Sequence, residues 1–432
     1  MRGREDVAAW AVSEFGAADL GDHPGASLPD ACADPATLKA AYRCFDTDAI
    51  TPDAMLTSHV QATYARLAAV PVVLAVNDTT LLDWTHHPAT ANLGPLASRR
   101  QQGVLVHSTL TFTPERAPLG RLGQDVRARD PATSGRLADQ HDRPIDEQER
   151  VTWRHSLAAI TAAAAACPAT RFVQVGDADA DVYDLFVAAR AANVDVLVRA
   201  GQDRRVEQAD RSLRAAVRRA PLASEVEVAL SRQGERPARR ATLAVRFRAV
   251  TLRPPGTRAG EQLPAAALWA VWAEEVGGPP GAEPVAWLLL TTCPVTSAAE
   301  AEERLLWYAC RWGIEVWHKV LKSGCQIEAR QLASRDRLAR ALPALPCTAL
   351  LEADEWQALW CAIHRSPTPP ARPPTLQEAV RWLGRLGGHP GRTRDGEPGV
   401  TVLWKGFQHL ADLATMYRIM KPSMHKEEVG KG

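Results

Sequence analysis

Polar side chains at helical spacing, set among aromatic residues, are the strongest chemical signal in the sequence. Tyr308, Arg311, Glu315 and Lys322 are three, four and seven residues apart, so on a helix their side chains fall near one another on one face. Three tryptophans stand close to Glu315 in the sequence, namely Trp307, Trp312 and Trp317. This pattern predicts an enclosed carboxylate between two cations, as in a functional site. The alternative is a set of exposed helix salt bridges, the commoner use of such spacing.

Two further acids accompany apolar runs that are typical of buried strands. Asp78 interrupts the run at 71–84, and burial of an unpaired carboxylate costs several kcal/mol, so it predicts a cation or a cage of hydrogen bonds. Asp177 follows the run at 171–176, at the carboxyl end of an expected strand, where α/β sheets usually place their chemistry. Alternatively, Asp78 caps a turn at a strand end and Asp177 caps the helix expected near Asp179.

The order strand Asp, strand Asp, helix Glu, with the spacing Tyr-x2-Arg-x3-Glu-x6-Lys, resembles the signature of the Tn-five-like (IS-four family) DDE transposases. The resemblance extends from about Trp10 to Tyr417 and is most specific around the three acids. It implies that Asp78, Asp177 and Glu315 are the catalytic residues and the metal ligands.

The resemblance also implies a reaction, a cofactor and partners. The reaction is cut-and-paste DNA transposition at insertion-sequence ends: nicking, hairpin formation, hairpin opening and strand transfer. The cofactor is Mg²⁺, which Mn²⁺ can replace, with two ions per active site about 4 Å apart; both ions prefer oxygen ligands. The partners are double-stranded DNA, as transposon ends and target, and a second copy of the chain in a DNA-bound homodimer.

Six side chains match positions that contact DNA in this family: Arg199, Trp287, Tyr308, Arg311, Lys319 and Lys322. The resemblance implies that Trp287 stacks on a flipped base, which returns about the few kcal/mol that base extrusion costs. It implies that the cations hold phosphates, to which Arg and Lys donate hydrogen bonds. The residues alone would equally fit a core tryptophan and a surface arginine at a strand end.

Hydrophobic periodicity predicts an α/β fold, and the order of its elements with the three acids resembles a ribonuclease H-like catalytic core. Strands are expected at about 70–80, 103–113, 171–177 and 195–199, and helices at about 151–167, after Asp179 and from about 297 to 322. Further strand patterns at 225–230, 241–251 and 268–272 indicate a β-rich insertion between the second Asp and the Glu.

The pattern, together with what the resemblance implies for each part, gives five regions. They are a helical DNA-end-recognition region at 1–60, the first part of the core at 61–200, the β-rich insertion at 201–290, the last part of the core with the catalytic Glu helix at 291–340, and a helical C-terminal region for dimerisation and DNA contact at 341–432.

The expected insertion is strongly basic, although the whole chain has a formal charge of only +1. Between Arg199 and Arg258 about fifteen Arg stand against about six acids, a local excess near +9. Such an excess would neutralise several phosphates of bound DNA. A solvated charged surface is the alternative.

Two departures from the family leave other functions open. After Leu20-Gly-Asp22 the chain lacks the basic helix expected to grip a DNA end. Pro343 and Pro346 argue against a helix where relatives have a long apolar one. An inactive relic or DNA-binding inhibitor of transposition is one alternative, and a structure-selective metal-dependent nuclease is another.

Composition is that of a globular multidomain protein, with 46% hydrophobic and 23% charged residues. Eight scattered cysteines without a CxxC pair argue against a zinc site. Neither a signal segment nor an apolar run of about 18 residues is found. We therefore expect a cytoplasmic, nucleoid-associated protein without membrane contact.

Overall fold

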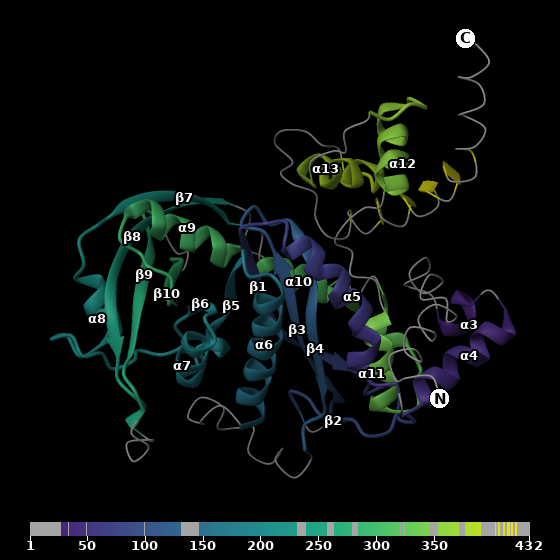
Figure 1. Cartoon of the computed structure of the whole chain (residues 1–432), viewed down its shortest axis with the longest axis horizontal. Helices are drawn as coiled ribbons and strands as arrows, with labels where there is room; N and C mark the ends of the chain where they lie inside the picture. Colours follow the sequence, from purple (N-terminus) through teal and green to yellow (C-terminus); the bar gives the residue numbers. More distant parts are fainter. Residues whose placement is uncertain are drawn as a thin grey trace.

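The structure is a computed structural model that describes residues 27–420 apart from several gaps. The gaps are 33, 49, 99, 131–146, 231–238, 257–262, 279–283, 320, 323–324, 345–352, 371–375, 390–401 and scattered positions between 403 and 419. The described residues form a mixed α/β protein, in which helices flank a ten-stranded sheet (Figure 1).

The sheet has the strand order β2-β3-β1-β5-β6-β10-β9-β8-β7, and β4 also pairs with β3. Its central strands β1, β5 and β6 are parallel, whereas β1, β3 and β4 are antiparallel neighbours. The strands are β1 Val72–Asp83, β2 Gly94–Pro95, β3 Gln102–Phe112, β4 Pro118–Arg127, β5 Arg171–Gly176, β6 Asp195–Arg199, β7 Ser224–Leu230, β8 Arg239–Leu252, β9 Ala266–Val276 and β10 Ala286–Thr291.

Helices cover both faces of this sheet. They are α3 Leu28–Ala31, α4 Pro35–Asp46, α5 Pro52–Leu67, α6 Glu147–Ala166, α7 Tyr183–Ala191, α8 Leu213–Arg218, α9 Ala298–Ala309, α10 Trp312–Lys319, α11 Arg335–Ala344, α12 Ala353–His364 and α13 Leu376–Leu386. Helices α5 to α8 share one hydrophobic cluster with the sheet, and α9 and α10 share another on its opposite face. Within the described part of the chain, no helix is both long and apolar enough to cross a membrane.

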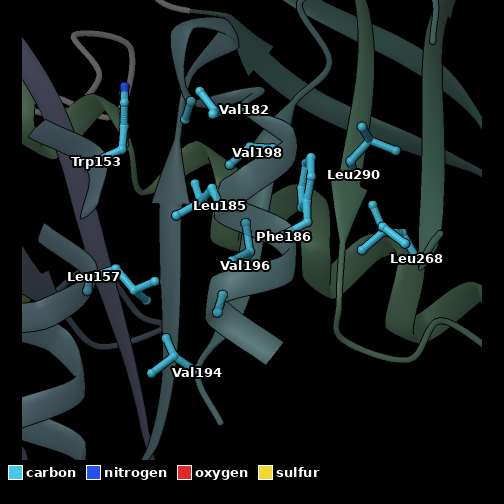
Figure 2. Close-up of a cluster of buried hydrophobic side chains, with 14 of the residues drawn as sticks. Trp153, Leu157, Val182, Leu185, Phe186, Val194, Val196, Val198, Leu268 and Leu290 are labelled. Atoms are coloured by element: carbon cyan, nitrogen blue, oxygen red, sulfur yellow. The ribbon is translucent and has the colours of Figure 1, made fainter. Parts of the chain in front are cut away.

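Strand alternation divides the central apolar residues between the two cores. On one face Leu185 and Phe186 of α7 pack against Val196 and Val198 of β6, with Trp153 of α6 beside them (Figure 2). These side chains are almost fully buried. The predicted strands and helices of the core are confirmed close to the expected residues.

The expected basic insertion continues the central sheet. Its strands β7, β8 and β9 follow one another in the sheet, and β10 pairs antiparallel with β6. The sequence did not predict β4, because Gly120 and Gly123 interrupt its apolar pattern and its pairing with β3 has register shifts. This strand nevertheless borders the α5 and α6 side of the sheet.

The single helix expected from about 297 to 322 is divided into α9 and α10. Around the division, backbone hydrogen bonds join residues that are three positions apart instead of four. Cys310 N donates to the Trp307 carbonyl at 3.0 Å, and Gly313 N donates to the Cys310 carbonyl at 2.9 Å. A Cβ on Gly313 would lie 2.8 Å from the Phe112 ring of β3. Close packing of this turn on the sheet accompanies the break, so the expected continuous helix was wrong.

The expectation that prolines exclude a helix after Arg340 was wrong for residues 341–344, because α11 continues through Pro343 to Ala344; residues 345–352 lie outside the described residues. Leu338 and Leu342 are fully buried in a cluster that includes Phe45 of α4. Burial of these side chains offsets the single hydrogen bond that a proline cannot donate. Arg340 also donates to the Phe45 carbonyl at 2.8 Å, which ties α11 to α4.

The C-terminal helices form a separate hydrophobic cluster that contains Leu359 of α12 and Leu383 of α13. These two helices lie together at the top of Figure 1. The described residues between 402 and 420 are helical, and Leu410 packs in the same cluster. The N-terminal pattern at 9–22 lies outside the described residues, whereas the expected helical segment at 40–46 belongs to α4.

Trp84 provides a test of how the sheet is tied to the segment after α10. Its side chain is 1% exposed, and its Nε1 donates to the Arg330 carbonyl at 3.1 Å. We expect Trp84→Ala to lower the free energy of unfolding by about 3–5 kcal/mol, because it leaves a large cavity. Urea denaturation followed by circular dichroism measures this. As a control, Leu306→Ala changes a side chain that is 54% exposed, and it should change the free energy of unfolding by less than about 0.5 kcal/mol. Equal effects of the two substitutions would contradict the role of Trp84 in tying the sheet to this segment.

Candidate active site

Asp78 lies in the middle of β1, so the alternative of a turn cap at a strand end was wrong. Its side chain shares a sheet face with Leu74 and Val76, which pack in the core below α9 and α10. The Thr79 backbone N–H donates to Asp78 Oδ1 at 2.8 Å. With a side chain only 18% exposed, Asp78 is a carboxylate in a largely apolar wall.

Asp177 follows the last residue of β5, the parallel neighbour of β1. Its Oδ1 accepts a hydrogen bond from Asp179 N at 3.0 Å and caps a short 3₁₀ turn at Ala178–Ala180. The capping role considered for this residue is therefore present. Its charge also acts on Asp78, so both strands contribute a carboxylate to one electrostatic site.

The surroundings of Asp78 disfavour its charged form. The pKa of Asp78 is raised to about 6, first by burial and then by the charge of Asp177, with a smaller contribution from Glu315; the Thr79 N–H and the Arg311 charge oppose this rise. A carboxylate pair of this kind is stabilised by any cation that approaches both members. The described residues provide Arg311 as one such cation.

A buried ion pair fixes the loop that carries Asp177. Asp181 Oδ1 accepts from Arg204 Nε at 2.7 Å, and Asp181 Oδ2 accepts from Gly201 N at 2.9 Å. The two side chains are 1% and 8% exposed, so removal of one partner would leave a buried charge. This pair holds the loop after β5 against the loop after β6. Sequence analysis missed it, because the two residues belong to different loops.

Glu315 lies in the first turn of α10, and the predicted enclosure of its carboxylate was wrong. Its side chain is 51% exposed and forms an ion pair with Arg311 at 2.6 Å. Trp307 and Trp317 are instead buried against the sheet. The salt-bridge alternative is therefore present for the Arg311–Glu315 pair, although Arg311 itself is only 14% exposed.

Aromatic side chains surround Arg311 on the side of the β10 strand. The Trp287 ring lies edge-on to Tyr308 at 6.0 Å and to Trp312 at 6.1 Å between centroids. Arg311 Cζ lies 5.9 Å from the Tyr308 ring centroid. Trp287 is 9% exposed, so its ring is part of this cluster and closed to solvent.

The remaining residues expected to contact DNA lie at different distances from the acids. Burial raises the pKa of Tyr308, and the charges of Arg311 and Arg199 oppose this rise, so Arg199 belongs to the same electrostatic site. Lys319 is exposed at the end of α10, and Lys322 is half-buried beyond it. The structure therefore groups Arg199, Tyr308 and Arg311 more closely with the acids than the two lysines.

His318 is a neighbour of Asp78 that sequence analysis missed. Its Nδ1 lies 3.8 Å from Asp78 Oδ2, and its side chain is 8% exposed. Burial, together with the charge of Lys322, lowers the pKa of His318 to about 4. The position three residues after Glu315 was the available signal, because it returns to the same side of a helix.

Asp78 and Asp177 suit a hard divalent cation, because both offer carboxylate oxygens and Asp78 is destabilised by its charged neighbours. Across the described residues, no three His, Cys, Asp or Glu side chains are grouped closely enough to hold a metal ion. Glu315 is engaged by Arg311. The carboxylate oxygens of Asp78 and Asp177 are ligands of the kind that Mg²⁺ and Mn²⁺ prefer, whereas Glu315 is not grouped closely with these two acids.

Most arginines of the basic segment are used within the fold, contrary to the expectation of a large free excess. Six of them pair with acids: Arg204–Asp181, Arg218–Glu274, Arg219–Asp210, Arg239–Glu275, Arg240–Glu227 and Arg248–Asp210. Arg246 and Arg248 also donate to the Ala220 and Ala216 carbonyls near the end of α8. Such contacts stabilise the helix C-terminus.

Five exposed arginines of the basic segment make no ion pair within the described ranges: Arg199, Arg205, Arg211, Arg214 and Arg253. Arg253 N donates to the Arg205 carbonyl at 2.9 Å, beside the bridge between Val206 and Leu252. Val206 and Leu252 are buried, so the two neighbouring arginines face outward together. Two like charges directly opposite one another repel, which favours an anion between them.

Two segments of the chain match known protein families. Residues 17–50 match the family described as Transposase DNA-binding, and residues 327–423 match the family described as Transposase Tn5 dimerisation domain. The first lies within the region expected to recognise DNA ends, and the second overlaps the expected C-terminal region. Both lie outside the strands that carry Asp78 and Asp177, so they support the resemblance independently of these acids. The two matches together support a Tn5-like transposase.

Proposed function

We propose that this transposase cuts and joins DNA with the acids Asp78, Asp177 and Glu315. The observation that carries the proposal is the placement of two carboxylates on adjacent parallel strands, one of them buried with its pKa raised to about 6. The order β4-β3-β1-β5-β6, with the third acid on the later helix α10, supports a ribonuclease H-like core.

Asp78, Asp177 and Glu315 would hold two Mg²⁺ ions, or Mn²⁺ in their place. Bound cations of this type activate a water or 3′-hydroxyl nucleophile and stabilise the leaving oxygen. Because Glu315 is half-exposed, replacing its partner Arg311 with another cation would cost little free energy of desolvation. The buried Asp78 gains most from such a cation, because its charged form is the least solvated.

The surrounding cations and aromatic rings would bind the DNA strand. Arg311 and Arg199 carry positive charge next to Tyr308, and this suits a phosphate that approaches the acids. Lys319 and Lys322 would contact the backbone farther along α10. Trp287 would stack on a flipped base only after its contacts with Tyr308 and Trp312 open, because it is 9% exposed.

The two matched families extend the proposal to partners. Residues 17–50 would bind the transposon end, and residues 327–423 would form the homodimer that holds two ends together. Arg337 and Arg340 of α11 form ion pairs with Asp46 and Asp48 at the end of α4. These contacts join the two matched segments within one chain. The reaction would proceed through nicking, hairpin formation, hairpin opening and strand transfer.

The triad is tested with Glu315→Gln on a labelled duplex that carries the DNA ends flanking the reading frame, in Mg²⁺ or Mn²⁺. We expect nicking to fall at least about 100-fold, because an amide cannot replace a charged ligand. The control is Glu303→Gln on α9, which removes one carboxylate that is 50% exposed. A folded wild-type protein that leaves the duplex intact would favour a relic or inhibitor. Cleavage without strand transfer would favour a nuclease.

Asp78→Asn tests the electrostatic cost of the acid pair in the metal-free protein. The pKa of Asp78 rises from 3.8 to about 6 on folding, so the folded chain binds more protons and loses stability as the pH rises through this window. We expect the variant to be more stable than wild type by up to about 3 kcal/mol at about pH 8, and by less than about 1 kcal/mol near pH 4.

Urea denaturation in the presence of a chelator measures this difference at both pH values. The control is Asp48→Asn, whose side chain is 99% exposed, and it should change the free energy of unfolding by less than about 0.5 kcal/mol. If the stability difference between Asp78→Asn and wild type is the same at both pH values, the raised pKa of Asp78 is not the cause of that difference.

The outward-facing arginines are tested with the double variant Arg205→Gln/Arg253→Gln. If each contacts one phosphate, the slope of log Kobs against log salt for DNA binding should become shallower by about 1 per contact. The matched control is Arg219→Gln/Arg240→Gln, which removes the same charge from two exposed arginines with acid partners. Equal slope changes in both variants would mean that net charge alone, and no contact at Arg205 and Arg253, governs binding.

A further inference from the structure

We propose that His318 and Ser108 are positioning residues that orient the carboxylate of Asp78. Neither residue was among the expected site residues. The inference rests on the proposed function, because it takes Asp78 to be a metal ligand. It adds a layer of contacts behind that ligand, from α10 on one side and from β3 on the other.

His318 approaches the one oxygen of Asp78 that the backbone does not hold. The Thr79 N–H donates to Oδ1 at 2.8 Å, while His318 Nδ1 lies 3.8 Å from Oδ2. A small rotation of either side chain would shorten this contact to a hydrogen bond. Donors at both oxygens would fix the plane of the carboxylate.

Because His318 is buried, few other groups can compete with Asp78 for a hydrogen bond to its ring. The residue is 7% exposed, and its Nε2 has no hydrogen-bond partner among the residues that the structure describes. A buried imidazole nitrogen without a partner is costly, and it requires a reason beyond packing. The contact of the opposite ring nitrogen with Asp78 supplies that reason.

Ser108 is the neighbour of Asp78 on the adjacent strand. It stands directly opposite Asp78 in the register of β1 and β3, so the two side chains lie on one face of the sheet. Ser108 is fully buried, and no partner of its Oγ is found in the described part of the chain. A hydroxyl in this position can donate to Asp78 directly or through one water.

These two groups match the arrangement by which proteins orient metal-ligating carboxylates. Hydrogen bonds to the ligand hold it in the orientation that the metal requires, and their loss typically lowers metal affinity 10- to 100-fold. Asp78 needs such support more than Glu315 does, because Glu315 is half-exposed and already paired with Arg311.

Two amides at position 318 separate this role from simple packing. The amide nitrogen of Asn occupies nearly the place of histidine Nδ1, whereas that of Gln occupies nearly the place of Nε2. We expect His318→Gln to weaken Mn²⁺ binding by the DNA-free protein about 10- to 100-fold. His318→Asn should remain within about threefold of wild type. Electron paramagnetic resonance measures free Mn²⁺ in these titrations without any reaction.

Ser108→Ala provides a second variant that does not depend on how well α10 tolerates substitution. It removes only the hydroxyl, and we expect it to weaken Mn²⁺ binding about 3- to 10-fold, in line with one lost hydrogen bond. Circular dichroism and thermal unfolding establish that each variant is folded. The inference is overturned if folded His318→Gln and Ser108→Ala bind Mn²⁺ as wild type does, or if Asn and Gln at position 318 are equally weak.

Asp78→Asn distinguishes failure of this inference from failure of the proposed function. If wild type binds no Mn²⁺ that depends on Asp78, the metal-binding role itself is wrong, and the inference falls with it. If wild type binds Mn²⁺ through Asp78 and the changes at His318 and Ser108 have no effect, only the positioning role is wrong.

Discussion

The repulsion between two carboxylates on adjacent strands is the constraint on which the site depends. Asp78 is held inside the sheet and Asp177 at the end of its parallel neighbour, so neither can move away without breaking the register of β1 and β5. Burial of Asp78 is the largest cause of its raised pKa, and the charge of Asp177 is the next. The surrounding residues moderate it through Arg311 and the Thr79 N–H.

The rest of the fold keeps these strands from relaxing. Large hydrophobic clusters cover both faces of the sheet, and the buried Asp181–Arg204 pair fixes the loop that follows Asp177. The long extension through β10, β9, β8 and β7 continues the same sheet. Its arginines mostly form internal pairs, so its first role is structural. Among its exposed arginines that have no acid partner in the described part of the chain, Arg205 and Arg253 lie next to each other and face outward.

Local pattern was sufficient to predict the central strands and the positions of Asp78 and Asp177 in and after them, because a carboxylate within a β-branched run is visible in the sequence itself. It was insufficient for Glu315, because helical spacing shows which side chains share a face but does not show which face is buried. The division between α9 and α10 depends on contact between Gly313 and Phe112, residues about two hundred positions apart. His318 was missed for the same reason, since its partner Asp78 is equally distant in sequence.

Charge counting failed for a related reason. The local excess between residues 199 and 258 ignored Asp181, Glu274 and Glu275, which lie outside that window and pair with three of its arginines. The register of β8 with β9 places Glu274 and Glu275 beside β8, and contact between the loops after β5 and β6 brings Asp181 to Arg204.

The three acids therefore differ in what they contribute to a metal site. Asp78 and Asp177 are placed by the rigid sheet, whereas Glu315 stands half-exposed on a short helix and is paired with Arg311. An exposed ion pair contributes about 0–1 kcal/mol, so release of Glu315 from Arg311 costs little. In the proposed metal site, the free energy gained on binding a cation would come more from Asp78, which is 18% exposed, than from Glu315, which is 51% exposed. For this reason the contacts immediately around Asp78, more than those around Glu315, should determine how tightly the site binds its cofactor.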